Sequence, residues 1–366
     1  MHTFCIPMNL TNRNTRNSTV HSFITKRKMC CLTIAALCVL LPLALLFSAG
    51  LGAMSISAKD VARILLGKLS GSEGLLQGIS AGGISVVFEL RLPRILCAAF
   101  TGAALAAAGV IFQAILQNPL ADPYTLGIST GAAFGATLAI FLNMLTALEL
   151  PAPLFALLFA GLTLIAVLAI ANRGAGIVKA NLIMAGIILS AILQAGVSFI
   201  KMASGENVGA IVFWLMGSLS GRSWGDVLLI APPISAALLL AFVFSRDLNL
   251  LSLGSRGAES LGVNVKRARV FYLLLGALIT AFSVSVCGII GFVGLVVPHL
   301  LRFSVSSDNR LLLPLASLAG ALLLVLADDA VRLVGTGETP VGALTTLLGG
   351  PFFIYIFIKR NGAARE

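Results

Sequence analysis

Residues 270–301, VFYLLLGALITAFSVSVCGIIGFVGLVVPHLL, decide the fold, because these 32 residues include no Lys, Arg, Asp or Glu. One continuous helix of this length would measure about 48 Å at 1.5 Å per residue, whereas the hydrocarbon core of a bilayer is about 30 Å thick. Three glycines and a proline interrupt the second half of the stretch. We therefore divide it into one membrane span at 268–287 and a second, short one at 290–303.

The rest of the chain repeats this uncharged pattern eight more times. The stretches without Lys, Arg, Asp or Glu lie at 29–58, 95–121, 123–148, 150–172, 180–200, 227–245, 311–327 and 339–358. A helix that crosses a membrane needs about 20 mostly apolar residues, and lipid favours helices because their backbone groups are paired internally. With 58% hydrophobic and 11% charged residues and a mean hydropathy of +1.02, the chain has no room for a sizeable soluble domain. The sequence therefore predicts an all-α polytopic membrane protein.

Ten membrane spans follow from these stretches, and an even number places both termini on the same side. The spans are expected at roughly 29–54, 93–117, 124–143, 150–172, 178–203, 227–245, 268–287, 290–303, 311–331 and 340–359. Residues 1–28 then form a flexible polar tail, residues 29–359 a single membrane domain, and residues 360–366 a second tail.

The net charge of +11 is explained by topology rather than by nucleic-acid binding. With both tails placed in the cytoplasm, 17 of the 25 Lys and Arg residues fall in inner loops and tails. Cytoplasmic loops of membrane proteins carry such an excess of basic residues. The six cysteines mostly lie in apolar spans and lack metal-ligand spacing, so we expect no disulfide, no metal site and no cofactor.

Glycine and proline mark the places where spans pack closely or break. Gly127, Gly131 and Gly135 form two GxxxG steps, which let another helix approach closely in lipid. Breaks follow the second and the seventh spans, and broken helices at membrane depth need protein or a water-filled cavity to cover the freed backbone. Counted as five spans per half, the two breaks predict an inverted repeat.

Two loops have features of their own. The outer loop 55–92 begins with Ser57 and an acidic residue three positions later, which is typical of a helix N-terminus, and predicts a short helix on the membrane surface. The inner loop 246–269 can form a short helix over 255–261 that ends at Gly262. A compact, basic helix–turn–helix suits docking on a partner protein, although a solvated connector would use the same residues.

A series of short motifs runs in order from about residue 50 to residue 359. The motifs are Arg91-Leu-Pro-Arg94, Gly102-Ala-Ala-Leu, Gln113, Asn118-Pro-Leu-Ala-Asp-Pro-Tyr-Thr-Leu-Gly127, Phe213-Trp-Leu-Met-Gly-Ser-Leu219, Leu261-Gly-Val-Asn, Gly288-Ile-Ile-Gly-Phe-Val-Gly-Leu-Val-Val-Pro-His299, Leu312-Leu-Pro through Asp328, and Glu338-Thr-Pro-Val-Gly-Ala-Leu-Thr-Thr-Leu-Leu-Gly-Gly-Pro-Phe-Phe353. This series resembles the FecCD-type permeases of ABC importers, which take up iron–siderophore complexes, haem or cobalamin. Only the tail 1–28 lies outside the resemblance.

The resemblance implies a cobalamin-permease-like fold in the cytoplasmic membrane of a bacterium or archaeon. It implies a homodimer with the pathway at its interface, two separate ATP-binding cassette ATPase subunits, and an extracytoplasmic substrate-binding protein. ATPase coupling is implied at Ser255, Arg256, Gly257, Ala258, Leu261 and Gly262. Docking of the binding protein is implied at Arg91, Arg94 and Arg332, where the alternative is an ordinary surface charge or lipid contact. Pathway or gate positions are implied at Ser198, Trp214, Gly342, Thr345 and Thr346.

The resemblance also bears on the energy source and the cargo. The chain lacks a G-x-x-x-x-G-K-[ST] phosphate loop, so it is not an ATPase and needs a separate one. A ferric siderophore is the favoured metal chelate because that branch of the family is broad, and haem and cobalamin stay open. The alternative is an ion-coupled secondary transporter, which would need an ionisable group near the middle of a span. The nearest candidates lie at span ends and have structural roles as alternatives: Asp328, Asp329, Glu338 and His299.

Overall fold

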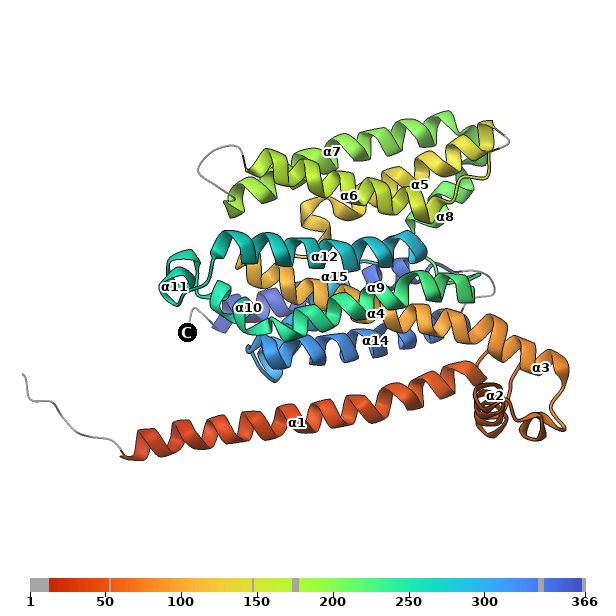
Figure 1. Cartoon of the computed structure of the whole chain (residues 1–366), viewed down its shortest axis with the longest axis horizontal. Coiled ribbons are helices and arrows are strands. Elements are labelled where there is room, and N and C mark those ends of the chain that lie inside the picture. Colours follow the sequence, from red (N-terminus) through yellow and green to blue (C-terminus); the bar gives the residue numbers. More distant parts are fainter. Residues whose placement is uncertain (1–12, 53, 147, 173–177, 335–338, 364–366) are drawn as a thin grey trace, which may run out of the picture.

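The structure is a computed structural model that describes residues 13–52, 54–146, 148–172, 178–334 and 339–363, and every regular element in these ranges is a helix (Figure 1). The elements in chain order are α1 (Arg13–Gly50), α2 (Ala58–Ser70), η1 (Glu73–Leu76), α3 (Ala81–Ser85), η2 (Val86–Arg91), α4 (Leu92–Leu116), η3 (Pro123–Leu126), α5 (Ile128–Leu145), α6 (Ala152–Ala171), α7 (Lys179–Ala203), η4 (Gly205–Val208), α8 (Gly209–Leu215), α9 (Trp224–Val243), α10 (Ser245–Ser252), α11 (Ser255–Ser260), α12 (Val265–Cys287), α13 (Val293–Ser304), α14 (Asn309–Val334) and α15 (Val341–Ala363). The predicted all-α class is confirmed.

Eight helices among the described residues are long and apolar enough to cross a membrane. They include Met29–Gly50 within α1 and the continuous run Ala81–Leu116, which joins α3, η2 and α4. The two remaining predicted spans correspond to α13 and to the apolar part of α15, Val341–Pro351. With 12 residues, α13 is about 18 Å long, roughly half the thickness of a hydrocarbon core. The polytopic class is confirmed, with α13 as a partial crossing.

The first helix begins earlier than its apolar stretch. Helix α1 starts at Arg13, so much of the segment that the sequence predicts as a flexible polar tail is helical. No glycine or proline occurs between Arg13 and Pro42, and the polar residues there do not stop a helix that the following apolar run stabilises. Residues 1–12 lie outside the described part of the chain.

The loop after α1 forms the predicted short helix. Helix α2 starts after Ser57, whose Oγ accepts a hydrogen bond from the backbone N–H of Asp60 at 3.1 Å. Its C-cap is Gly71 in the left-handed conformation, with φ +67°. Both ends of the helix therefore follow from ordinary capping chemistry.

The second span starts about ten residues earlier than predicted. Helix runs without a gap from Ala81 to Leu116, and its η2 segment is a π-helical turn over Val86–Arg91. Pro93 lies two residues after this turn, and a proline inside a helix lacks an N–H and clashes with the carbonyl four residues before it. The wider π turn accommodates this clash. Arg91 and Arg94 consequently lie within a long helix rather than at its start.

Helix α4 forms the centre of the bundle, with α9, α12 and α14 around it (Figure 1). Two glycines let neighbouring backbones touch it. A Cβ at Gly102 would lie 2.2 Å from the carbonyl oxygen of Gly320, and a Cβ at Gly109 would lie 1.9 Å from that of Gly294. Because any side chain would clash there, glycine sets the closeness of the α4–α14 and α4–α13 crossings.

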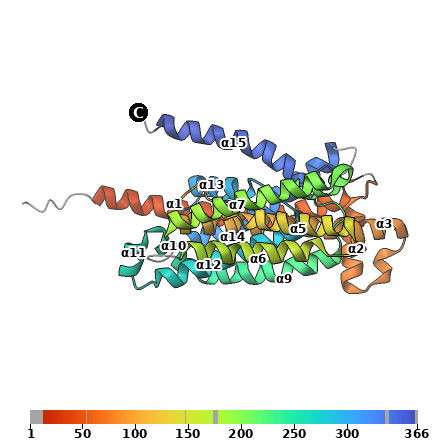
Figure 2. The same ribbon diagram turned by 90° about the horizontal axis from the view of Figure 1, so that it is seen from above.

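Helices α7 and α15 lie at the periphery. In α7 only 17% of the most apolar window is buried within this chain, against 83% for the run that includes α4. The exposed large apolar side chains of α7 are Met184, Ile187, Ile188, Ile192, Phe199 and Met202. Helix α15 packs on α13 and α14 and then diverges from the bundle (Figure 2). These two helices therefore offer apolar surface to lipid or to another subunit.

Hydrogen bonds define two ends of the bundle, which we name after the short helices there. At the α11 end, Gln117 after α4 reaches the last residues of α10, and Asn249 in α10 reaches Asp308 before α14. At the α2 end, Ser48 in α1 reaches Asp329 in α14. The predicted breaks after α4 and α12 contact each other, since the Tyr124 hydroxyl donates to the Ile290 carbonyl at 2.5 Å. The inverted repeat stays a prediction.

Candidate functional site

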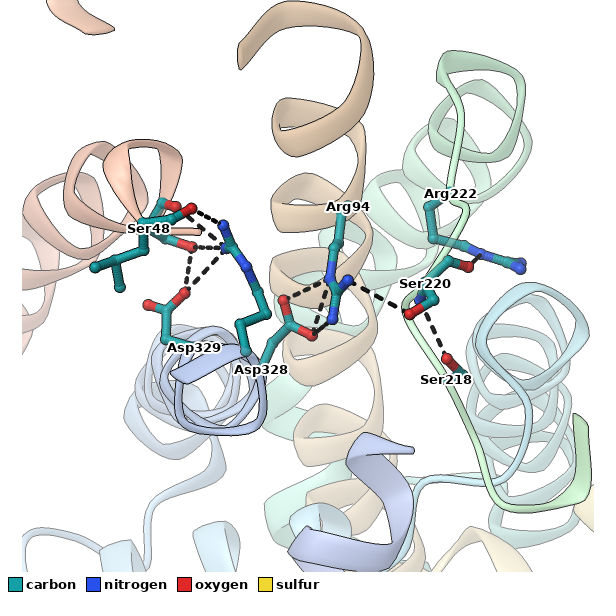
Figure 3. A network of polar contacts seen from close by, with 9 residues as sticks. Ser48, Arg94, Ser218, Ser220, Arg222, Asp328 and Asp329 are labelled. Carbon is teal, nitrogen blue, oxygen red and sulfur yellow. Dashed lines mark hydrogen bonds and ion pairs between the residues drawn. The ribbon is translucent and has the colours of Figure 1, made fainter. Parts of the chain in front are cut away.

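A network of buried polar groups occupies the α2 end (Figure 3). Arg94 in α4 forms a two-pronged ion pair with Asp328 in α14, with Nε 2.9 Å from Oδ2 and Nη2 2.8 Å from Oδ1. The side chain of Asp328 is 2% exposed and that of Arg94 is 21% exposed. Arg94 Nη1 also points at Ser220 Oγ, 3.4 Å away. Paired in this geometry, guanidinium and carboxylate hold α4 and α14 together with strong, directional hydrogen bonds.

The neighbouring acid in α14 ties this network to the first helix (Figure 3). Ser48 Oγ donates to Asp329 Oδ1 at 2.5 Å, and Arg332 Nη1 lies 3.3 Å from the same oxygen. Arg332 also donates to the carbonyl oxygens of Ser48, at 3.1 Å, and of Leu51. The last turn of α1 therefore receives several of its missing hydrogen bonds from α14.

Arg91 completes the cap of α1. Its Nη1 donates to the carbonyl oxygens of Ala49 at 2.9 Å and Gly50 at 3.1 Å, and its Nη2 donates to that of Met54. The residue is only 7% exposed. A guanidinium placed on the free carbonyls at a helix C-terminus is favoured both by hydrogen bonding and by the helix dipole.

The structure thus brings Arg91, Arg94 and Arg332 together at one end, as the docking prediction requires. It also shows that each of the three already donates to acceptors of this chain. Arg94 is the most accessible guanidinium of the three for a partner. Their role in docking stays a prediction.

At the α11 end, the loop 246–269 folds into two short helices, α10 and α11, rather than the single helix predicted. Helix α10 was missed because its two buried anchors, Leu248 and Leu251, stand in a short charged segment. Helix α11 ends as predicted at Gly262, whose φ is +84° and whose N–H donates to the Glu259 carbonyl at 2.9 Å. Gly262 therefore has the left-handed conformation, in which a residue other than glycine would be strained.

The predicted coupling residues lie mainly on the outside of this loop. Ala258 is buried and anchors α11 to the bundle, whereas Arg256 and Leu261 are exposed. Ser255 Oγ accepts a hydrogen bond from Arg269 Nη2 at 3.1 Å, and Gly257 is half-buried. Nothing lies within 4 Å of a Cβ built on Gly262. The tip of the loop is therefore accessible, with one buried anchor.

Gln117 joins this loop to the central helix, and sequence reasoning missed it. It follows α4 in a left-handed conformation, φ 49°, that is uncommon for a residue other than glycine. Its Nε2 donates to the carbonyls of Leu251 and Ser252, both at 3.0 Å, and its Oε1 accepts from Lys179 Nζ. The side chain thus caps α10 and links α4, α7 and α10. The strained backbone would have been invisible in the sequence, where Gln117 only precedes an Asn-Pro turn.

The predicted pathway residues fall on different helices. Ser198 is exposed on α7, and its Oγ donates to the Gln194 carbonyl. Trp214 lies near the end of α8. The residues that follow this helix pack against α15, since a Cβ on Gly342 would be 2.3 Å from the Met216 carbonyl oxygen. The hydroxyls of Thr345 and Thr346 both donate to the Gly342 carbonyl, at 3.0 Å and 2.8 Å.

The predicted packing glycines lie against α6 and α7. A Cβ on Gly131 would be 2.8 Å from the Phe159 carbonyl oxygen, and one on Gly135 would be 2.3 Å from that of Phe155. Gly127, with φ +77°, faces Ser190 of α7. Of the ionisable residues considered, Asp328 and Asp329 belong to the α2-end network, and Glu338 lies outside the described residues. The His299 ring lies beside that of Phe353, tilted by 59° with the ring centroids 5.7 Å apart.

The fold defines a polytopic, all-helical membrane protein. The family model described as the FecCD transport family matches residues 40–359. The chain belongs to the FecCD transport family.

Named relatives agree with this. The haemin transport system permease HmuU of Yersinia pestis is 38% identical over 90% of this chain and 96% of its own length. The Fe(3+) dicitrate permease FecD of Escherichia coli is 40% identical over 75% of this chain and 85% of its own length. A solved structure of a candidate metal-chelate type ABC transporter, in an inward-facing conformation, superposes with a TM-score of 0.78, 34% identity, and coverage of 89% of this chain and 98% of that one. These findings confirm the predicted class, a permease of ABC importers.

Proposed function

We propose that this chain imports a metal chelate across the cytoplasmic membrane of a bacterium or archaeon, driven by ATP. The observation that carries the proposal is the family match over 40–359, which includes nearly all described helices. Relatives named for haemin and ferric dicitrate support a metal chelate as the cargo. A ferric siderophore is our favoured cargo, with haem and cobalamin as the other members of the class.

A separate ATPase supplies the energy in this proposal, because the chain has no phosphate-binding loop of its own. Two ATPase subunits would dock on α11 through Ser255, Arg256, Gly257, Ala258, Leu261 and Gly262. The exposed tip of α11 and its buried residue Ala258 support this role. A partner can bind the exposed face of α11, while Ala258 packs against the bundle and couples a shift of α11 to the other helices.

Gln117 passes the movement on in this proposal. Its two hydrogen bonds to α10 lie directly behind the docking loop, and α4 is the helix that the other helices surround. A shift of α10 and α11 would therefore also displace the end of α4, because these hydrogen bonds connect the two directly. The left-handed backbone at Gln117 supports a functional reason for the link, because such strain persists where surrounding contacts over-determine it.

The proposal completes the importer with a second copy of the chain and a binding protein. The exposed apolar faces of α7 and α15 support a homodimer, with Ser198, Trp214, Gly342, Thr345 and Thr346 near the pathway. Carboxylates of an extracytoplasmic binding protein would meet Arg91, Arg94 and Arg332 at the α2 end, first at the accessible Arg94. The excess of basic residues in the segments at the α11 end supports a cytoplasmic position for that end and for both termini.

The test is affinity purification of the chain from its native membranes in mild detergent, followed by mass spectrometry. Recovery of a Walker-motif ATPase at one copy per permease is the expected result. A co-purified binding protein can then be titrated with a ferric siderophore, haem and cobalamin to identify the cargo. Recovery of a pure oligomer without ATPase, under conditions that preserve a known ABC importer, would refute the ATP-driven mechanism.

A further inference from the structure

A cavity of about 950 Å³ opens at the α11 end, between the end of α9, the start of α10 and the loop that joins α13 to α14. We name it the Arg302 cavity. Its walls are Phe242, Val243, Ser245, Arg302, Phe303, Ser304, Val305, Ser306, Ser307, Asp308, Arg310 and Leu311. It lies apart from the exposed tip of α11 and from the polar network of the α2 end.

Arg302 is the reason to expect an anion in this cavity. Within the described part of the chain, its Nη2 has two hydrogen bonds, both long: 3.3 Å to Asn309 Oδ1 and 3.4 Å to the Val110 carbonyl oxygen. Its Nε is buried and has no hydrogen-bond partner among the described residues. No carboxylate in the described chain forms an ion pair with it. A partly buried cation without a counter-ion is unfavourable, so the site favours a negatively charged ligand.

The one acid in the cavity does not supply that counter-ion. Asp308 is engaged by Arg310, whose Nη2 lies 2.7 Å from Oδ2, and by Asn249, whose Nδ2 lies 2.6 Å from Oδ1. The hydrogen bonds from Arg310 lower the pKa of Asp308 below its usual range. Asp308 and Arg310 thus neutralise each other, and the charge of Arg302 remains.

The other walls divide into a polar and an apolar part. Ser304, Ser306 and Ser307 line the same cavity as Arg302 and form, with it, the polar part of the wall. The Ser304 hydroxyl donates to the Leu300 carbonyl, and Ser306 Oγ accepts from the Asp308 N–H. Phe303 is 87% exposed, and Phe242 and Val243 are exposed beside it. These apolar side chains lie at the ends of α9 and α13, two apolar helices of the membrane domain, where an exposed phenyl ring suits acyl chains rather than water. A soluble anion would use the polar part alone, whereas an amphiphile uses both.

We propose that the Arg302 cavity binds an anionic phospholipid of the cytoplasmic leaflet, with the lipid phosphate on Arg302 and the acyl chains along Phe303, Phe242 and Val243. Basic pockets between membrane helices on the cytoplasmic side recognise anionic headgroups in this way. A lipid there bridges α9 and α13, and so stabilises the bundle beside the loop that carries α10 and α11.

The test measures lipid retained by the purified full-length permease. The protein is exposed to equal amounts of phosphatidylglycerol and phosphatidylcholine with identical acyl chains, and retained lipid is counted by native mass spectrometry. Arg302→Gln removes the charge, and Ser307→Asp keeps Arg302 but adds a negative charge at an exposed position. Lys266→Gln is the matched control, because it removes an exposed positive charge in the same inner region outside the cavity.

The expected result is preferential retention of phosphatidylglycerol by the unchanged protein and by Lys266→Gln. Retention should fall about fivefold in both cavity variants, the effect expected for one basic group near an anionic lipid surface. Equal retention of both lipids, or no loss in either cavity variant, would overturn the proposal. So would displacement of the lipid by millimolar inorganic phosphate, which would assign the site to a soluble anion. Loss of the lipid on addition of a co-purified ATPase would assign the surface to that protein instead.

Discussion

At the α2 end, three arginines are satisfied by acceptors of their own chain, whereas at the α11 end several basic residues are exposed and unpaired. Arg94 meets the buried Asp328, and Arg91 and Arg332 cap α1. Arg256 and Lys266, by contrast, are exposed and have no ion pair in the described part of the chain. The same kind of side chain therefore holds the fold together at one end and is available to partners at the other. The deciding factor is whether the chain itself places acceptors opposite the arginine, either a buried acid or the free carbonyls at a helix end.

The two ends should differ most in how much the free energy of unfolding falls when the paired acid at each end, Asp328 or Asp308, is replaced. Asp328→Ala leaves Arg94 without its buried partner and should lower the free energy of unfolding by about 3 kcal/mol, as for other broken buried ion pairs. Asp308→Ala breaks a pair whose arginine side chain is 61% exposed and one hydrogen bond from Asn249, and should cost about 1 to 2 kcal/mol. Chemical unfolding of both variants in the same detergent measures the difference. Equal losses would show that the two ends do not differ in the way described.

Removing exposed groups at the α11 end should change transport and leave stability alone. Arg256→Ala removes an exposed side chain that forms no ion pair with the described residues, so the free energy of unfolding should change by less than about 0.5 kcal/mol. Chelate uptake should nevertheless fall about tenfold if one hot-spot contact to the ATPase is lost. Gly262→Ala should act similarly, with an added strain of about 1 kcal/mol from its positive φ.

Uptake in reconstituted vesicles and co-purification of the ATPase measure these effects together. Lys68→Ala in α2, at the other end of the bundle, is the control, because the proposal assigns that helix no role in coupling. Normal uptake in both loop variants would remove α11 from the coupling mechanism, while the family assignment would stand.

Gln117 offers a test of how the α11 end communicates with the centre of the bundle. Gln117→Ala removes both hydrogen bonds to α10 and should reduce transport per ATP hydrolysed by about fivefold, while ATPase binding persists. Lys179→Ala is the matched control, because it removes only the contact that Gln117 accepts and leaves both bonds to α10 intact. An unchanged ratio of transport to hydrolysis in Gln117→Ala would show that α4 receives the movement by another route.

The helices could be predicted from the sequence because length and hydrophobicity alone determine which segments suit a bilayer. The cap of α2 at Ser57 and the end of α11 at Gly262 could also be predicted, since both depend on residues a few positions apart. The π turn before Pro93 could not, because a proline can be accommodated in more than one way.

The partners of the arginines were beyond sequence reasoning for a different reason. Arg94 and Asp328 are 234 positions apart, and hydrophobic patterns do not state which helix faces which. The signal available was the adjacent pair Asp328 and Asp329 at the end of a span, which marks a buried acid but not its partner. The same limit explains why Gln117 was missed, because its acceptors are backbone carbonyls that any sequence would provide.

A partly buried acid that has no ion pair among the described residues gives the smallest and sharpest test of this contrast. Asp122, in the loop after α4, caps η3 by accepting from the N–H groups of Tyr124 and Thr125 at 3.1 Å and 3.0 Å. Burial raises its pKa from 3.8 to about 6, although these hydrogen bonds oppose the rise. The folded protein therefore holds this proton more tightly than the unfolded chain, so the contribution of Asp122 to the free energy of unfolding falls as pH rises from about 4 to 6 and is constant above.

Asp122→Asn keeps the cap and cannot titrate. Its stability should exceed that of the unchanged protein at pH 7.5, and the difference should shrink towards pH 4.5 in thermal unfolding. If the stabilities of the two proteins change in parallel over this pH range, then the loop compensates the buried charge of Asp122, as the α2 end does for its acids.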